Sequence, residues 1–162
     1  MTQNLLLRKI ITDDNSALAV IIRSSLKEFN ANKPGTVYFD ESTDHLSDIF
    51  LVPNSGYFVL EINGEVAGGG GFYPTEGLDT ETCELVKMYL SKKYRGKGYG
   101  KMILEKCMES ARENGFTKMY IETMPELTDA ITMYQKNDFY FLPGPLGNSG
   151  HTGCNVWMLK DL

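Results

Sequence analysis

The chain has no long hydrophobic run, which excludes several classes of protein. No segment approaches eighteen consecutive apolar residues, and residues 1–9 contain neither a long apolar run nor a small-residue cleavage site. We therefore expect no membrane span and no secretory signal. Basic residues are also few, with 16 Lys and Arg against 21 Asp and Glu, and they form no stripe. Binding to nucleic acid takes clustered positive charge, so we expect no nucleic-acid partner.

Cysteine and histidine are also scarce, with three and two residues. Cys83, Cys107 and Cys154 are odd in number and contain no Cys-x-x-Cys pair, and His45 and His151 are single histidines without a partner at metal-ligand spacing. We therefore expect no disulfide framework and no metal, and a reducing, cytoplasmic location.

What is present suits one compact domain spanning residues 1–162. Apolar residues make up 42% and charged residues 23%, and the net charge of −5 suits amine-bearing substrates better than anionic ones. Periodicity predicts helices after a cap at Thr12 or Asp13, at 43–50, after the glycines near residue 100, and at 126–137. The predicted strands are 5–11, 57–62, 66–73, 83–90, 118–123, 139–142 and 155–160. In 83–90 we expect Val86, Met88 and Leu90 to share a face.

The most informative segment is the run Arg95-Gly96-Lys97-Gly98-Tyr99-Gly100, between a predicted strand and an amphipathic helix. Glycines let a backbone approach an anion, and a helix N-terminus favours negative charge, so the segment predicts a pyrophosphate site. A nucleotide-triphosphate loop would need Ser or Thr after Lys101, where Met102 stands. A dinucleotide loop stays open because Glu122 is near the expected acidic position. Gly68 to Gly71 lie mid-strand, where we expect close backbone packing.

Two motifs together resemble those of the GNAT superfamily of acyl-CoA N-acyltransferases. Arg95, Gly98 and Gly100 are similar to its Gln/Arg-x-x-Gly-x-Gly/Ala loop, and Ala130 to Phe139 are similar to its Ala-x-x-x-Tyr-x-Lys-x-Gly-Phe element. The resemblance covers residues 59–141. It implies an α/β (α+β) fold: a mixed, largely antiparallel sheet flanked by helices, whose central strands splay to admit the acyl-CoA. Those strands would be 83–90 and 118–123.

The resemblance also implies site residues. Glu84, eleven residues before Arg95, would be the general base, and Tyr134 would protonate the coenzyme thiolate. A strand bulge would turn backbone N–H groups of Met88 and Leu90 toward the coenzyme. Leu127 stands where many members have Asn, and Asp138 replaces a glycine. The implied cofactor-binding residues are Met88, Leu90, Arg95, Gly96, Lys97, Gly98, Tyr99, Gly100 and Lys101.

The function implied is an N-acetyltransferase that moves an acetyl group from acetyl-CoA directly to an amine of a small molecule or peptide. A non-catalytic acyl-CoA-binding regulatory domain and a dinucleotide-binding oxidoreductase are the alternatives, and a homodimer is left open. We expect His151 to face the acceptor pocket and Cys154 to be structural. Asp40, Glu41 and Asp44 are expected near the acceptor entrance, where they would attract a cationic or zwitterionic amine.

Overall fold

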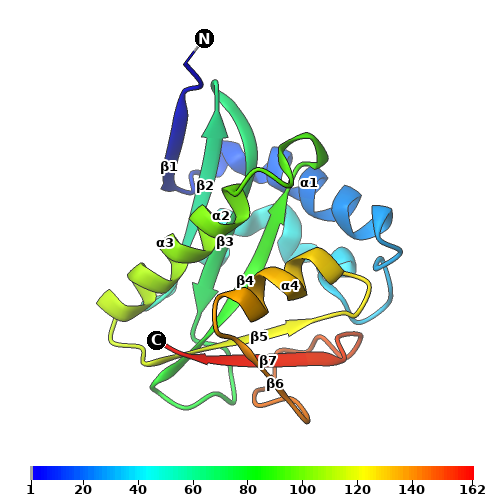
Figure 1. The fold of residues 1–162 in the computed structure, drawn as a ribbon, viewed down its shortest axis with the longest axis vertical. Helices are drawn as coiled ribbons and strands as arrows, with labels where there is room; N and C mark the ends of the chain where they lie inside the picture. The colour runs from blue at the N-terminus through cyan, green and yellow to red at the C-terminus, as the bar shows by residue number, and fades with distance from the viewer. Residues whose placement is uncertain (1) are drawn as a thin grey trace.

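The computed structural model describes residues 2–162, which form one seven-stranded sheet with helices on both faces (Figure 1). The strand order is β1-β2-β3-β4-β5-β7-β6. Only β4 and β5 pair in parallel; the other neighbours are antiparallel. The mixed, largely antiparallel sheet predicted from the sequence is therefore confirmed. The strands are β1 Leu5–Lys9, β2 Gly56–Ile62, β3 Glu65–Tyr73, β4 Thr82–Leu90, β5 Lys118–Thr123, β6 Tyr140–Leu142 and β7 Val156–Asp161.

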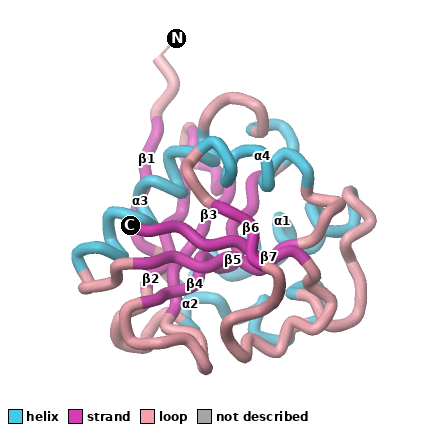
Figure 2. The backbone as a smooth tube through the Cα atoms, turned by 60° about the horizontal axis from the view of Figure 1, so that its bottom comes forward, coloured by secondary structure: helices cyan, strands magenta, loops and turns pink. Residues whose placement is uncertain are grey.

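The helices divide the apolar core into two parts. Helices α1 (Asn15–Glu28) and α2 (Leu46–Ile49) pack on one face of the sheet, around Ile22, Leu46 and Val59. Helices α3 (Tyr99–Glu113) and α4 (Thr128–Lys136) pack on the other face, around Ile103 and Tyr134. Figure 2 shows the strands as one layer between these helices. The sheet is thus covered on both faces, as a mixed sheet of this size requires.

Local sequence signals explain several elements. Asn63 and Gly64 both take positive φ, 53° and 81°, which is the geometry of the two-residue turn expected between β2 and β3. Helix α3 ends at Glu113 with Asn114 as its cap, and Gly115 follows with φ 89°, the left-handed stop expected of the Asn-Gly pair. Asp138 also takes a left-handed conformation, φ 70°, so the replacement of glycine there is accommodated.

The four glycines of β3 serve close packing. A Cβ added at Gly68 would lie 2.2 Å from the carbonyl oxygen of Tyr89, and one at Gly69 would lie 2.5 Å from the ring of Tyr57. Such distances are far below van der Waals contact, so only glycine fits. The expectation of close backbone packing for this run is confirmed.

Strand β4 contains a bulge. Tyr89 pairs with Gly69 and Val86 with Gly71, so two β4 residues, Lys87 and Met88, lie opposite the single residue Gly70. Lys87 takes φ 51°, unusual for a residue other than glycine. The bulge reverses the alternation of the strand, because Leu85, Met88 and Leu90 pack with α3 while Tyr89 packs with α1. The prediction that Val86 shares a face with Met88 and Leu90 is therefore wrong.

Strands β4 and β5 separate after Glu84, ahead of the bulge, and they splay as the resemblance implied. Their pairing extends only from Thr82 with Lys118 to Glu84 with Tyr120. The rest of β4 therefore has no partner on this side, and its backbone groups are available to a ligand.

Some element boundaries differ from the sequence predictions. Thr12 and Asp13 belong to a 3₁₀ turn, and α1 begins at Asn15 after the buried Asp14. The helix predicted at 43–50 is a 3₁₀ turn at Glu41–His45 followed by the short α2. Asp14 accounts for the first difference, since it accepts a hydrogen bond from the Ile11 N–H and two from Arg8.

Candidate active site

The separation of β4 from β5 opens a groove of about 620 Å³. Its walls come from β4, from the glycine-rich segment before α3, from the end of β5 and from α4. One end therefore reaches the predicted pyrophosphate site, and the other reaches the splayed strands.

The glycine-rich segment has the backbone geometry of an anion site. Gly96 and Gly98 take positive φ, 73° and 86°, and α3 begins directly afterwards at Tyr99. The first N–H groups of a helix have no partner within it, and here they meet the groove at Gly100 and Lys101. The positive end of the α3 dipole adds to the charge of Lys101.

Most of the predicted cofactor-binding residues line this groove. Those that do are Met88, Leu90, Arg95, Gly96, Gly98, Gly100 and Lys101. Two do not. Lys97 is exposed outside the groove, and Tyr99 is buried with its hydroxyl donating to Gln3 Oε1 at 2.7 Å. Tyr99 can therefore contribute only its backbone N–H to an anion, and its side chain anchors the start of α3.

Arg95 is held by several partners although it lines the groove. Its guanidinium donates to the carbonyl oxygen of Leu90 at 3.0 Å, to Glu28 Oε2 at 2.8 Å and to Ser25 Oγ at 3.0 Å, and it lies over the Phe29 ring. These contacts join the end of β4 to α1. Arg95 thus fixes the shape of the glycine-rich segment, a role that the motif alone did not indicate.

Tyr134 lies on α4 and lines the groove from the α3 side of the sheet. The residue is buried, with 5% exposed, and its ring packs against Phe139. Burial raises the pKa of Tyr134 above its ordinary value, so the phenol stays protonated at neutral pH. A protonated hydroxyl in this position is able to donate to a ligand in the groove.

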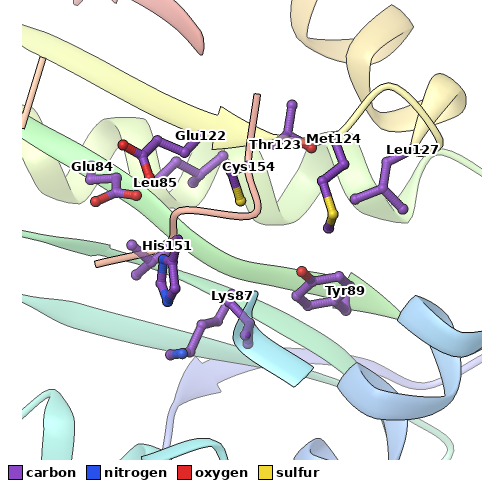
Figure 3. Close-up of a pocket in the computed structure, with 12 residues that line it drawn as sticks. Glu84, Leu85, Lys87, Tyr89, Glu122, Thr123, Met124, Leu127, His151 and Cys154 are labelled. Carbon is purple, nitrogen blue, oxygen red and sulfur yellow. The ribbon is translucent and has the colours of Figure 1, made fainter. Parts of the chain in front are cut away.

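A second, smaller cavity of about 70 Å³ adjoins the groove (Figure 3). The two spaces share residues of both splayed strands, and both are lined by Leu127 at the start of α4. The shared wall consists of Leu85, Lys87, Tyr89, Glu122, Thr123 and Leu127. A molecule in the small cavity would therefore lie beside one in the groove.

Glu84 is the buried acid of this small cavity. Its carboxyl accepts a hydrogen bond from Thr75 Oγ1 at 2.6 Å, and only 4% of the residue is exposed. Burial raises the pKa of Glu84 to about 7, opposed by the Thr75 hydrogen bond and assisted by the nearby charge of Glu122. Glu84 is thus placed and tuned to exchange a proton near neutral pH.

The loop before β7 and the loop after α1 cover one side of this cavity. His151 Nε2 lies 2.6 Å from Asp40 Oδ2, and the Gly153 N–H donates to the Gly35 carbonyl, so the loop before β7 is tied to the loop after α1. Glu122 accepts hydrogen bonds from Tyr120 and Ser149. His151 lines the cavity.

Cys154 also lines the cavity, but burial raises the pKa of its thiol to about 12. The thiol therefore stays protonated and is a poor nucleophile.

None of the loop carboxylates expected near the acceptor entrance, Asp40, Glu41 and Asp44, lines the small cavity, and two of them are paired with cations. Asp44 is bonded by both terminal nitrogens of Arg23, and Asp40 is shared by His151 and Lys87. Glu84 and Glu122 are the carboxylates that reach the cavity instead. Sequence reasoning did not place Glu122 with Glu84 in one cavity, and it missed Lys87 altogether.

Within residues 2–162, no group of three or more His, Cys, Asp or Glu side chains could hold a metal ion. No helix in the same range is long and apolar enough to cross a bilayer.

Comparison with known proteins gives the family. Residues 22–139 match the acetyltransferase (GNAT) family. The chain is 40% identical, over 99% of its length and 96% of the relative's, to "Uncharacterized N-acetyltransferase YjgM" of Escherichia coli K12. Its fold is similar to that of a GNAT-family acetyltransferase from Staphylococcus aureus Mu50, with a TM-score of 0.84, 20% identity and coverage of 98% and 99% of the two chains. It is also similar to yncA of Salmonella typhimurium, a putative acetyltransferase solved with its cofactor acetyl-CoA (TM-score 0.77, 18% identity, coverage 98% and 94%).

The chain therefore belongs to the GNAT acetyltransferase family. It is an acyl-CoA-dependent N-acetyltransferase, and the resemblance stated from Arg95, Gly98, Gly100 and the Tyr134 motif is confirmed.

Proposed function

We propose that this protein transfers an acetyl group from acetyl-CoA directly to an amine in a ternary complex. The observation that carries the proposal is the shared wall between the long groove and the small cavity. The groove has the size and the helix N-terminus suited to a coenzyme with a pyrophosphate. The small cavity has a buried acid suited to an amine.

In the proposed reaction the amine nitrogen attacks the thioester carbonyl, forming a C–N bond as the C–S bond breaks. The amine loses one proton to Glu84, directly or through a water. The departing thiolate gains one from Tyr134, and the cycle closes when Glu84 releases its proton to solvent and Tyr134 takes one up. N–H groups freed where β4 leaves β5 are the proposed donors to the carbonyl oxygen. Positioning in one complex supplies much of the rate, and no covalent enzyme intermediate is needed.

The acceptor is an amine of a small molecule or peptide. The cytoplasmic location expected from the cysteines remains a prediction, as does a homodimer. The non-catalytic alternative is not favoured, because a domain that only binds coenzyme would need neither the buried carboxyl of Glu84 nor an adjoining cavity.

Tyr134→Phe tests the proposed acid. The change removes the hydroxyl but keeps the ring that packs against Phe139, so the fold should be retained. We expect kcat to fall roughly ten- to a thousandfold with little change in acetyl-CoA affinity. Tyr94→Phe is the matched control, because Tyr94 is another buried tyrosine but its hydroxyl donates to Glu65 outside the groove. Equal kcat values for wild type and Tyr134→Phe would remove Tyr134 from the mechanism.

A further inference from the structure

The small cavity contains a buried ammonium group that the proposed mechanism does not use. Lys87 lies at the bulge of β4, and only 8% of its side chain is exposed. It lines both the cavity and the groove. Lysine is rarely buried without a close partner, because removing an ammonium from water costs several kcal/mol.

The partner of Lys87 is distant. Its ion pair within residues 2–162 is with Asp40, and the two atoms, Nζ and Oδ2, are 3.5 Å apart. That distance leaves at best a weak hydrogen bond, and an ammonium has three protons to donate. Burial lowers the pKa of Lys87 below its ordinary value, while the charges of Asp40 and Glu84 oppose this. Asp40 therefore takes at most one of the three protons that the Lys87 ammonium can donate.

Asp40 does not depend on Lys87. The same oxygen, Oδ2, lies 2.6 Å from His151 Nε2, which is its closer partner. The ammonium could turn on its flexible stem toward an anion in the cavity and leave Asp40 hydrogen-bonded. A new anion would thus give Lys87 a closer partner, and Asp40 would still be hydrogen-bonded to His151.

The cavity also separates opposite charges. The carboxylates of Glu84 and Glu122 come from β4 and β5 at one side, while Lys87 and His151 lie at the other (Figure 3). Val37, Val86 and Met124 add apolar lining. The volume of about 70 Å³ has room for on the order of five water molecules, comparable to an amine, a carboxylate and the carbon between them.

We propose that the acceptor is a small free amino acid, whose carboxylate binds the ammonium of Lys87 while its amine lies next to Glu84. This inference rests on the proposed function, since it names the substrate of the same site. Lys87 then selects against amines that lack a carboxylate. It also selects against peptide N-termini, whose first carboxyl group is an uncharged amide.

The first test compares matched acceptors with the wild-type enzyme. Alanine, valine and leucine are each paired with their carboxamides, and 3-methylbutylamine, spermidine and an alanine-initiated peptide complete the panel. Release of CoA thiol is followed with acetyl-CoA present. We expect kcat/KM to be at least about tenfold higher for each acid than for its carboxamide, which corresponds to about 1.4 kcal/mol.

The second test assigns that preference to Lys87. Lys87→Met keeps the length of the side chain without its charge, and the ratio of acid to carboxamide should fall to about one through a rise in KM for the acids. Lys87→Arg should keep most of the ratio. Lys92→Met is the matched control, because Lys92 has an ion pair of the same 3.5 Å length but its side chain is 82% exposed and outside both spaces. Thermal unfolding shows whether each variant is folded.

The outcomes separate the two proposals. Preference for carboxamides, peptides or simple amines over the free amino acids would overturn the amino acid assignment and leave the transferase proposal intact. A purely structural role for Lys87 would lower turnover of acids and carboxamides alike, and that result would also overturn the inference. Failure of every amine to release CoA, while acetyl-CoA still binds, would overturn the proposed function itself.

Discussion

The carboxyl group of Glu84 should control how activity depends on pH. Burial raises its pKa to about 7, so the carboxylate needed as a base forms only as pH rises through neutrality. We expect kcat/KM to rise with pH around 7, and Glu84→Gln to lower kcat and to flatten this acidic limb. The pH–rate profile measures this change, with Glu81→Gln as the control, because Glu81 is an exposed glutamate in the turn directly before β4. An unchanged limb in Glu84→Gln would remove Glu84 as the base.

Glu122 gives a sharper form of this test. Its charge contributes to raising the pKa of Glu84, although burial contributes more. Glu122→Gln should therefore move the acidic limb to lower pH without abolishing activity. A shift to higher pH, or none, would mean that the two carboxyl groups are not coupled.

Glu84 should also make stability depend on pH. The folded-state pKa lies above that of the unfolded chain, so the folded protein binds this proton more tightly. The stabilisation is full below the unfolded value, near 4.5, and is lost as pH rises through about 7. At pH 8, where burying the charge costs on the order of 3 kcal/mol, Glu84→Gln should be more stable than wild type. Urea unfolding at pH 5 and pH 8 measures the difference, which should be small at pH 5.

The turn before α3 is the element on which coenzyme binding depends. Gly98 has φ 86°, and a Cβ there would meet no protein atom within 4 Å, so a side chain would extend into open space at the groove. Gly98→Val adds backbone strain and a branched group where the pyrophosphate is expected. We expect acetyl-CoA affinity to fall at least about tenfold in calorimetry.

The variant Gly115→Val distinguishes the effect of backbone strain from the effect of a side chain that blocks the coenzyme. Gly115 lies at the other end of α3, has φ 89°, and also has no atom within 4 Å of an added Cβ. It should lose similar stability but keep its acetyl-CoA affinity. Equal loss of affinity in both variants would indicate destabilisation of the helix rather than a contact at Gly98.

The elements were predictable where short-range signals define them. Asn63-Gly64 specifies its turn, and the glycines before α3 specify an anion site, because positive φ is a local property of the backbone. The bulge in β4 was implied only by family resemblance. Lysine has no special propensity for the φ of 51° that Lys87 adopts. Period-2 alternation therefore assigned Val86, which precedes the bulge, to the wrong face of the sheet. The position of the bulge depends on how β4 pairs with Gly70 of β3, and the periodicity of a single strand carries no information about that pairing.

Over the whole molecule, the coenzyme side of the site was more predictable than the acceptor side. Motifs along 84–139 identified Glu84, Tyr134 and the glycine-rich segment, most of which line the two spaces. The small cavity instead joins Lys87, Glu122 and His151 with Val37, which are far apart in the chain. Such contacts follow from the sheet order and from loops tied by Asp40 and His151, so a single sequence gives little signal for them.

Acetyl-CoA should stabilise the whole fold, because the groove joins strands and helices from both halves of the sheet. A ligand at a hundred times its Kd adds about 2.7 kcal/mol to the free energy of unfolding. For a chain of 162 residues this corresponds to a rise in Tm of roughly 5–10 °C. Differential scanning fluorimetry with acetyl-CoA measures this rise in Tm, and Gly98→Val should lose most of it.

NAD at the same concentration should give no rise in Tm. Met88, Leu90 and the splayed end of β4 form a groove for an extended coenzyme arm rather than a dinucleotide crevice. A larger shift with NAD than with acetyl-CoA would favour the dinucleotide reading that Glu122 left open.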